Sequence, residues 1–228
     1  MRIAITRLPE KGADDTERCA RFGHSCYPVS PLRAEVYPDA RDAFIAALEK
    51  GRFDALFFTS ALPADLVGPA LARSGRRTRV VAIGPATRAA LARHGVESEV
   101  LPGFYSRDFA PHLGAWLRGR RIGLPRADVP NEPLLEAIRA AGGVPEEFRI
   151  YGLRRTGEPL DLDGADAVLF TSANSFSEAV WTPRPGLLVC AIGEVTAERM
   201  RGAGVEPDAV GDGSLEGALR AIGAIGTR

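Results

Sequence analysis

Two short phrases occur together twice in this chain, in the same order. The first copy reads LFFTS from Leu56 and then VVAIGPAT from Val80; the second reads VLFTS from Val168 and then LVCAIGEVT from Leu188. In each phrase an apolar run ends at Thr-Ser or at Gly and a segment of helical period begins at once, which is typical of a buried strand followed by a helix. The copies lie much farther apart than the roughly 20–50 residues of solenoid repeats, so we expect each copy in its own domain.

The rest of the chain continues the alternation of strand and helix. Apolar runs rich in Val, Ile and Leu, such as RIAIT and HSCYPV, are separated by amphipathic segments long enough for helices. Strands that are apolar on both faces and alternate with helices indicate parallel sheets covered on both sides. The sequence therefore predicts an α/β protein with two similar domains. It leaves open which domain takes the strands at 2–6 and 25–29.

Charge and composition argue against several classes of partner and cofactor. The 29 basic and 29 acidic residues cancel, so no global field favours binding to nucleic acid or to an anionic membrane. No segment sustains the roughly 18 apolar residues of a membrane span, and the first residues turn charged too early for a signal peptide, so we expect a cytoplasmic protein. The three cysteines lack zinc or disulfide spacing, and the GxGxxG, GxxxxGK[ST], HExxH and GxSxG motifs are missing. We therefore predict no metal site and no nucleotide cofactor.

Hydroxyl side chains stand at two of the predicted helix starts. Thr59 and Ser60 end the strand of the first copy, and Thr171 and Ser172 end the strand of the second. A hydroxyl at such a position caps the amides of the first helical turn, and it also binds an anionic ligand that approaches the helix start. Both interpretations, capping and ligand binding, stay open at this point.

The other two helix starts of the repeat follow a glycine. Gly84 and Gly193 close their strands, and Thr87 and Thr196 stand in the first turn of the helices that follow. We expect the glycines to allow a sharp turn, and the helix N-termini to present unpaired amides with a partial positive charge that attracts carboxylates or phosphates. Ligands of parallel sheets bind beyond the carboxyl ends of the strands, so we expect the four junctions to line a cleft between the domains.

Several longer motifs, taken in order, carry a resemblance to one family. They are ITR, FTSA, VVAIGPATRAALARHGV, LPRAD with LLEAIRAAGG, RIYGLRRT, and finally FTSAN, CAIGEVT and GSLEGAL. Each motif alone is degenerate, whereas their order and spacing are fairly specific and extend over nearly the whole chain. The sequence resembles the uroporphyrinogen-III synthases. Two segments, FYSRDFAPHL and VPNEPLL, depart from the usual pattern of that family.

The resemblance implies two parallel-sheet, flavodoxin-like lobes joined by two extended crossings. Lobe 1 is then discontinuous and consists of 1–32 and 156–228, which assigns the N-terminal strands. Lobe 2 is the middle of the chain, 38–149, and the crossings are 33–37 and 150–155. The resemblance also implies a monomer.

For activity, the resemblance implies a hydro-lyase without a metal or cofactor. The family dehydrates and cyclises linear hydroxymethylbilane, with inversion of ring D, to uroporphyrinogen III for tetrapyrrole biosynthesis (heme, siroheme and cobalamin). The pyrrole nitrogen itself expels the hydroxyl to give an azafulvene cation, so modest acid help and electrostatic stabilisation suffice. The alternative interpretation is a noncatalytic two-lobed protein that binds an anionic small molecule, because its helix starts would look the same.

The positions that matter in the family carry over to residues of this chain. Tyr151, in RIYGLRRT, aligns with a tyrosine over the family's cleft and is the predicted catalytic residue, as a donor to the departing hydroxyl. Ser60, Thr87, Ser172 and Thr196 align with hydroxyl residues, and we assign them to the binding of substrate carboxylates. The other predicted substrate-binding residues are Arg7, Thr59, Gly84, Thr171 and Gly193.

Overall fold

The chain forms two compact units, each with its own sheet. The computed structural model describes residues 1–8, 12, 14–75 and 78–225 of the 228-residue chain. Unit 1 consists of Met1–Ala34 with Arg154–Arg228, and unit 2 of Glu35–Leu153.

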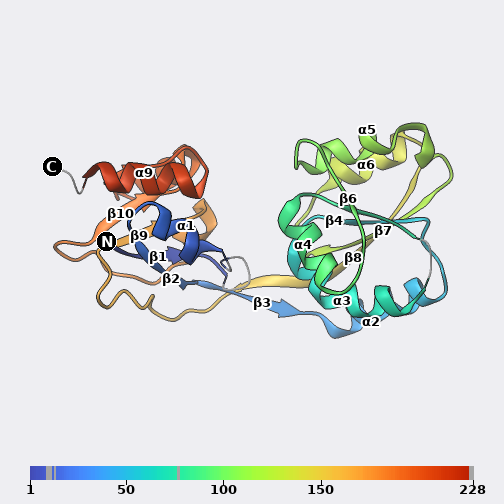
Figure 1. The fold of residues 1–228 in the computed structure, drawn as a ribbon, viewed down its shortest axis with the longest axis horizontal. Coiled ribbons are helices and arrows are strands. Elements are labelled where there is room, and N and C mark those ends of the chain that lie inside the picture. The colour runs from blue at the N-terminus through green and yellow to red at the C-terminus, as the bar shows by residue number, and fades with distance from the viewer. Residues whose placement is uncertain (9–11, 13, 76–77, 226–228) are drawn as a thin grey trace. The chain divides into compact units, whose positions relative to one another are not determined.

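Among the described residues, unit 1 forms a five-stranded parallel sheet (Figure 1). In spatial order its strands are β2 (Ser25–Val29), β1 (Arg2–Thr6), β9 (Ala167–Phe170), β10 (Leu188–Ala191) and β11 (Ala209–Val210). Numbered along the chain, the order is second, first, third, fourth and fifth, which is that of flavodoxin-like sheets.

Helices cover both faces of the unit 1 sheet, because its strands are apolar on both sides. On one face, residues such as Ile3, Ile5 and Leu169 pack against two of the helices, and on the other face Val168 and Phe170 pack against the remaining two. The first pair is α1 (Asp15–Arg21) and α9 (Leu215–Ile225), and the second is α7 (Ala173–Ser177) and α8 (Glu194–Arg201). This two-sided core is the one predicted from the continuous apolar strand runs.

Unit 2 contains the second sheet, which has six strands within the described part of the chain. In spatial order these are β3 (Leu32–Val36), β8 (Val144–Arg155), β7 (Arg121–Ala127), β4 (Ala55–Phe58), β5 (Arg79–Ala82) and β6 (Glu99–Val100). From β8 to β6 every neighbouring pair is parallel. The strands β3 and β8 each extend across a boundary between the units.

The helices of unit 2 also lie on both faces of its sheet (Figure 1). The face with α5 and α6 holds a core in which the rings of Phe57 and Phe109 stack with their centroids 4.2 Å apart. On the opposite face Phe44, Phe53 and Phe148 form an aromatic cluster. The helices are α2 (Pro38–Glu49), α3 (Ala61–Arg73), α4 (Pro85–Arg93), α5 (Phe109–Leu113) and α6 (Glu132–Ala140), with short 3-10 turns at Ser106–Asp108 and Gly114–Leu117.

Five neighbouring strands of the unit 2 sheet lie in the same spatial order as the five strands of the unit 1 sheet. The chain enters this arrangement at different strands in the two units. In space, β8-β7-β4-β5-β6 corresponds to β2-β1-β9-β10-β11. Equivalent aspartates support this correspondence: Asp54 Oδ2 accepts the Arg121 amide at 2.8 Å, and Asp166 Oδ2 accepts the Arg2 amide at 2.7 Å. The predicted α/β class with two similar parallel sheets is confirmed, and the repeated phrases mark equivalent strands.

An ion pair at the outer edge of the unit 2 sheet predicts how stability depends on pH. Glu99 of β6 accepts hydrogen bonds from Arg79 Nε at 2.5 Å and Nη2 at 2.8 Å, and His112 Nε2 lies 2.9 Å from its Oε2. The Arg79 hydrogen bonds above all lower the pKa of Glu99 to about 2, from an ordinary value of 4.5. Because the folded-state pKa is lowered, the stabilisation is complete above pH 4.5 and is lost as the pH falls toward about 2.

We therefore expect Glu99→Gln to lower the unfolding free energy at neutral pH, with a difference from wild type that shrinks between pH 4.5 and about 2. The Glu99 side chain is 40% exposed, so the difference is on the order of 1 kcal/mol or less. Urea unfolding followed through Trp116, in a Trp181→Phe background, reports on unit 2 alone. The exposed Glu97→Gln is the matched control, and an equal difference at all pH values would contradict the prediction.

Candidate functional site

In unit 1, Thr171 and Ser172 of the Thr-Ser phrase both hydrogen-bond to other residues of the same unit. Ser172 is the N-cap of α7: its Oγ accepts the Ser175 amide at 3.0 Å, and Ser175 Oγ accepts the Ser172 amide at 3.1 Å. The Thr171 hydroxyl donates to the backbone oxygen of Thr6 at 2.5 Å, and the Thr171 amide donates to Thr6 Oγ1 at 3.1 Å. Capping therefore describes Ser172, whose side chain is exposed and whose hydroxyl hydrogen the cap leaves unused.

The same phrase in unit 2 makes different contacts. Ser60 is the N-cap of α3, but its side chain makes no capping hydrogen bond. Its Oγ lies instead 3.2 Å from the hydroxyl of Tyr151, on β8. The half-buried Thr59 has no side-chain hydrogen bond to any described residue. The capping interpretation is thus wrong for Ser60, and two residues predicted separately, Ser60 and Tyr151, are in contact.

The backbone of Tyr151 is held at the carboxyl end of the unit 2 sheet. Tyr151 pairs with Ala127 at the end of β7, next to a register shift, and its carbonyl oxygen accepts the Asp128 amide at 2.7 Å. The side chain is buried, with 5% of the residue exposed. The strands β4 and β7 are neighbours, but the chain leads from β4 to β5 on one side and from β7 to β8 on the other. Ligands of open α/β sheets bind at the carboxyl edge of such a switch point. The tyrosine hydroxyl and Ser60 therefore lie at the edge of unit 2 where sheets of this topology usually bind ligands.

Two buried threonines stand in the first turns of the Gly-initiated helices. Thr87 in α4 and Thr196 in α8 are each 3% exposed, and neither hydroxyl hydrogen-bonds to a described residue. Each follows an N-cap glycine, Gly84 or Gly193, that has no side chain to cap the helix amides. A hydroxyl that hydrogen-bonds to no described residue and stands beside the positive end of a helix is suited to a carboxylate oxygen.

The expected reason for the two glycines is wrong. Gly84 has φ −162° and Gly193 has φ −172°, which is extended backbone that any residue adopts. The two positions differ in the space available for a side chain. A Cβ on Gly193 lies 2.9 Å from the backbone nitrogen of Gly213, whereas a Cβ on Gly84 lies 3.7 Å from the Phe104 ring. Glycine is therefore required at position 193 by the close approach of another backbone segment, and a methyl group fits at position 84.

We expect Gly193→Ala to destabilise unit 1 by about 1–3 kcal/mol, because the backbone at Gly213 must move to admit the methyl group. The matched variant Gly84→Ala should change the unfolding free energy of unit 2 by less than about 1 kcal/mol. Urea unfolding followed through Trp181 and Trp116, one in each unit, measures both changes. Equal losses in the two variants would contradict this steric account.

Arg7 lies just beyond β1 and is paired with a carboxylate of its own unit. Its Nη1 donates to both carboxylate oxygens of Asp15, at 2.8 and 3.0 Å. Burial raises the pKa of Asp15, and the guanidinium groups of Arg7 and Arg18 act in the opposite direction. The charge of Arg7 is therefore largely compensated within unit 1, which reduces its attraction for a substrate carboxylate.

Two aromatic residues that the sequence analysis does not single out are Phe104, which lies beside Gly84, and its neighbour Tyr105. Phe104 and Tyr105 are 54% and 58% exposed, and Arg107 stacks over the Tyr105 ring at 4.4 Å. Phe104 is the only non-glycine residue with positive φ, 59°, among the described residues. The signal in the sequence is the FY pair at the start of FYSRDFAPHL, a segment already noted as unusual.

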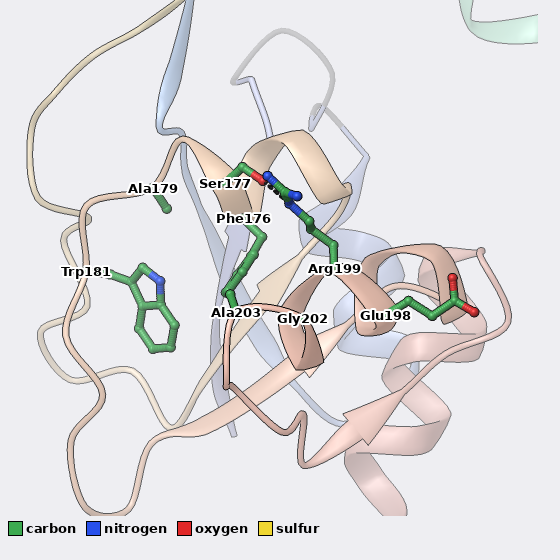
Figure 2. Close-up of a pocket in the computed structure, with 8 residues that line it drawn as sticks. All are labelled: Phe176, Ser177, Ala179, Trp181, Glu198, Arg199, Gly202 and Ala203. Atoms are coloured by element: carbon green, nitrogen blue, oxygen red, sulfur yellow. Dashed lines mark hydrogen bonds between the residues drawn. The ribbon is translucent and has the colours of Figure 1, made fainter.

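Unit 1 also contains a cavity of about 570 Å³ (Figure 2). In it Arg199 Nε donates to Ser177 Oγ at 2.7 Å, beside the C-terminal turn of α7. Its lining residues are Phe176, Ser177, Ala179, Trp181, Glu198, Arg199, Gly202 and Ala203. None of the predicted site residues lines it. Within the described ranges there is also no group of three His, Cys, Asp or Glu residues that suits a metal ion, and no helix long and apolar enough to cross a bilayer.

Solved structures with a similar fold include proteins from Helicobacter pylori and Thermus thermophilus. A uroporphyrinogen-III synthetase from Helicobacter pylori is 16% identical, with a TM-score of 0.62 and full coverage of both chains. Two structures of uroporphyrinogen III synthase from Thermus thermophilus, a mutant and the wild type, are 20% and 23% identical, with TM-scores of 0.57 and 0.51; each match covers 100% of this chain and 98% of that chain. A comparison with curated proteins finds no match.

Family membership rests on a sequence match that spans most of the chain. The family model described as uroporphyrinogen-III synthase HemD matches residues 14–220. That range includes both copies of the repeated phrases, Tyr151 and both buried threonines. The chain therefore belongs to the uroporphyrinogen-III synthase family of cyclising hydro-lyases.

Proposed function

We propose that Tyr151 donates a hydrogen bond to the departing hydroxyl when this chain converts hydroxymethylbilane to uroporphyrinogen III. The observation that carries the proposal is the position of the tyrosine hydroxyl, 3.2 Å from Ser60 Oγ at the carboxyl edge of the unit 2 sheet. Because the ring is buried and its backbone is paired, the hydroxyl has little freedom to move. A fixed donor loses little entropy when the leaving oxygen arrives.

The proposed chemistry does not require a strong general acid from the enzyme. The lone pair of the terminal pyrrole nitrogen forms a C=N bond within its ring as the C–O bond of the hydroxymethyl group breaks, and the leaving hydroxide takes up a proton from the solvent to depart as water. The phenol O–H of Tyr151 is a hydrogen-bond donor, so it suits stabilisation of the leaving oxygen and a contribution of about 10²-fold. The azafulvene cation is then attacked by the substituted carbon of ring D, which gives the spiro intermediate that leads to inversion of that ring.

We further propose that helix starts in each unit bind carboxylates of the substrate. The support is strongest for Thr87 and Thr196, whose hydroxyls hydrogen-bond to no described residue at the first turns of α4 and α8. Ser172 retains an unused hydroxyl hydrogen, whereas the Thr171 hydroxyl is already engaged with Thr6. The expected contributions of the remaining positions stay predictions; these are Arg7, Thr59, Ser60, Gly84, Thr171 and Gly193.

The wider setting follows from the reaction class. We propose that the chain acts as a monomer in the cytoplasm, in tetrapyrrole biosynthesis. Its balanced charge, with 29 basic and 29 acidic residues, favours a small anionic substrate held by local contacts over a nucleic acid partner. No cofactor is required in this mechanism, because the pyrrole nitrogen supplies the electrons that expel the hydroxyl.

The test is to supply the protein with freshly generated hydroxymethylbilane and to separate the type I and type III uroporphyrin isomers after oxidation. Without an enzyme, closure proceeds without ring inversion and gives type I. We expect type III to predominate. A type I product equal to the protein-free control would reject the activity and leave a noncatalytic anion-binding protein as the better description.

A further inference from the structure

We infer that Ser60 positions the hydroxyl of Tyr151, and that Pro63 frees Ser60 for this task. The inference rests on the proposed role of Tyr151 and reassigns Ser60 from carboxylate binding to the support of the tyrosine. It starts from the 3.2 Å contact between Ser60 Oγ and the Tyr151 hydroxyl, which joins the start of α3 to β8 across 91 residues of sequence.

A comparison between the units shows why Ser60 does not cap its helix. In unit 1 the N-cap Ser172 accepts the amide of Ser175, the third residue of α7. In unit 2 the third residue of α3 is Pro63, which has no N–H group to donate. Proline is well tolerated in a first helical turn, because that amide has no intrahelical partner. The capping bond made by Ser172 is therefore unavailable to Ser60.

The residue that Ser60 contacts is also particular to unit 2. The equivalent strand pairs begin at Arg121–Val144 in unit 2 and at Arg2–Ser25 in unit 1, so Val29, the last residue of β2, corresponds to Phe148. Tyr151 lies three residues beyond Phe148, where β8 continues and β2 has already ended, so the tyrosine has no counterpart on β2. Pro63, which removes the capping donor, and Tyr151, which contacts Ser60, both belong to unit 2, on α3 and β8.

The direction of the hydrogen bond follows from the proposed chemistry. If the Tyr151 hydrogen points to the leaving oxygen, the tyrosine oxygen accepts, and the Ser60 hydroxyl donates. A donated bond draws electron density from the phenol oxygen and limits rotation of its O–H group. Ser60 therefore acts through Tyr151, as a positioning residue that sets where the donor points.

One arm of the test observes the contact without turnover. Protein carrying a carbon label at tyrosine Cζ gives a resonance that is assigned to Tyr151 by its loss in Tyr151→Phe. We expect this resonance to move in Ser60→Ala, and also in Pro63→Ser, because the substitution restores a backbone amide that draws Ser60 back to the capping role. The matched control is Ser74→Ala, which removes a hydroxyl from the other end of α3 and should leave the resonance in place.

The other arm measures kcat and KM for hydroxymethylbilane. We expect Ser60→Ala to lower kcat about 3- to 10-fold with an unchanged KM, and to have no further effect in a Tyr151→Phe background. An unmoved Cζ resonance overturns the inference, as does a Ser60→Ala loss of equal size in both backgrounds, which would assign Ser60 to the substrate itself. A moved resonance with no loss in Tyr151→Phe keeps the positioning by Ser60 and rejects the catalytic role proposed for Tyr151.

Discussion

Tyr151→Phe is expected to lower kcat for formation of type III uroporphyrinogen about 10²-fold, with little change in KM. The substitution keeps the buried aromatic ring and removes the hydroxyl that lies 3.2 Å from Ser60. The loss falls on kcat because the leaving oxygen gains negative charge only as its bond to carbon breaks. The measurement is the initial rate of type III formation over a range of hydroxymethylbilane concentrations.

A control separates this loss from a loss of folding. Tyr27→Phe removes a tyrosine hydroxyl that donates to the Asp161 carbonyl oxygen at 3.1 Å in unit 1, and turnover should be unchanged. We expect Tyr151→Phe to cost about 0.5–1.5 kcal/mol of unfolding free energy, the typical value of one hydrogen bond. Full turnover in a folded Tyr151→Phe protein would remove the tyrosine from the mechanism and leave the family assignment in place.

Phe57→Ala is expected to lower the unfolding free energy of unit 2 by about 3–5 kcal/mol. Phe57 is fully buried in β4, and its ring stacks on that of Phe109 with centroids 4.2 Å apart. Truncation leaves a cavity between the sheet and α5, at the strand that leads directly to Ser60. The measurement is urea unfolding followed through Trp116 in a Trp181→Phe background, so that unit 2 is observed alone.

A matched substitution tests whether burial is the cause. Phe104→Ala makes the same chemical change in the same unit at a residue that is 54% exposed, and it should cost less than about 1 kcal/mol. If Phe57→Ala does not fold, Phe57→Leu keeps most of the side-chain volume and is expected to cost about 1–2 kcal/mol. Equal losses at the buried and exposed positions would contradict the assignment of the core.

The repeated phrases show how far local sequence carries. LFFTS and VLFTS each predict a buried strand followed at once by a helix, and both junctions form as expected in β4 with α3 and in β9 with α7. These phrases predict the junctions reliably because the formation of a buried strand and of a helix start depends mainly on residues that are close in sequence. The same locality limits it, since Ser60 and Ser172 look equivalent in sequence and make different hydrogen bonds.

The AIG phrases show a second limit, which concerns steric contact. Sequence reasoning assigned Gly84 and Gly193 one common reason, a sharp turn, and both have extended backbones. The real difference is the backbone of Gly213, which passes close to Gly193 and belongs to the loop before α9. A contact between separate loops leaves no periodic or compositional trace, so it appears only when the chain has folded.

Short segments of sequence were enough to predict the α/β class, the duplication, and the hydroxyl and glycine residues at the helix starts, because each of these depends on side-chain pattern among near neighbours. Only the folded structure shows that the two sheets share one strand order although the chain enters them at different strands. Only the folded structure also shows which group each hydroxyl hydrogen-bonds to. The physical reason is distance along the chain. Ser60 and Tyr151 are 91 residues apart, and only the pairing of β7 with both β4 and β8 brings them within 3.2 Å.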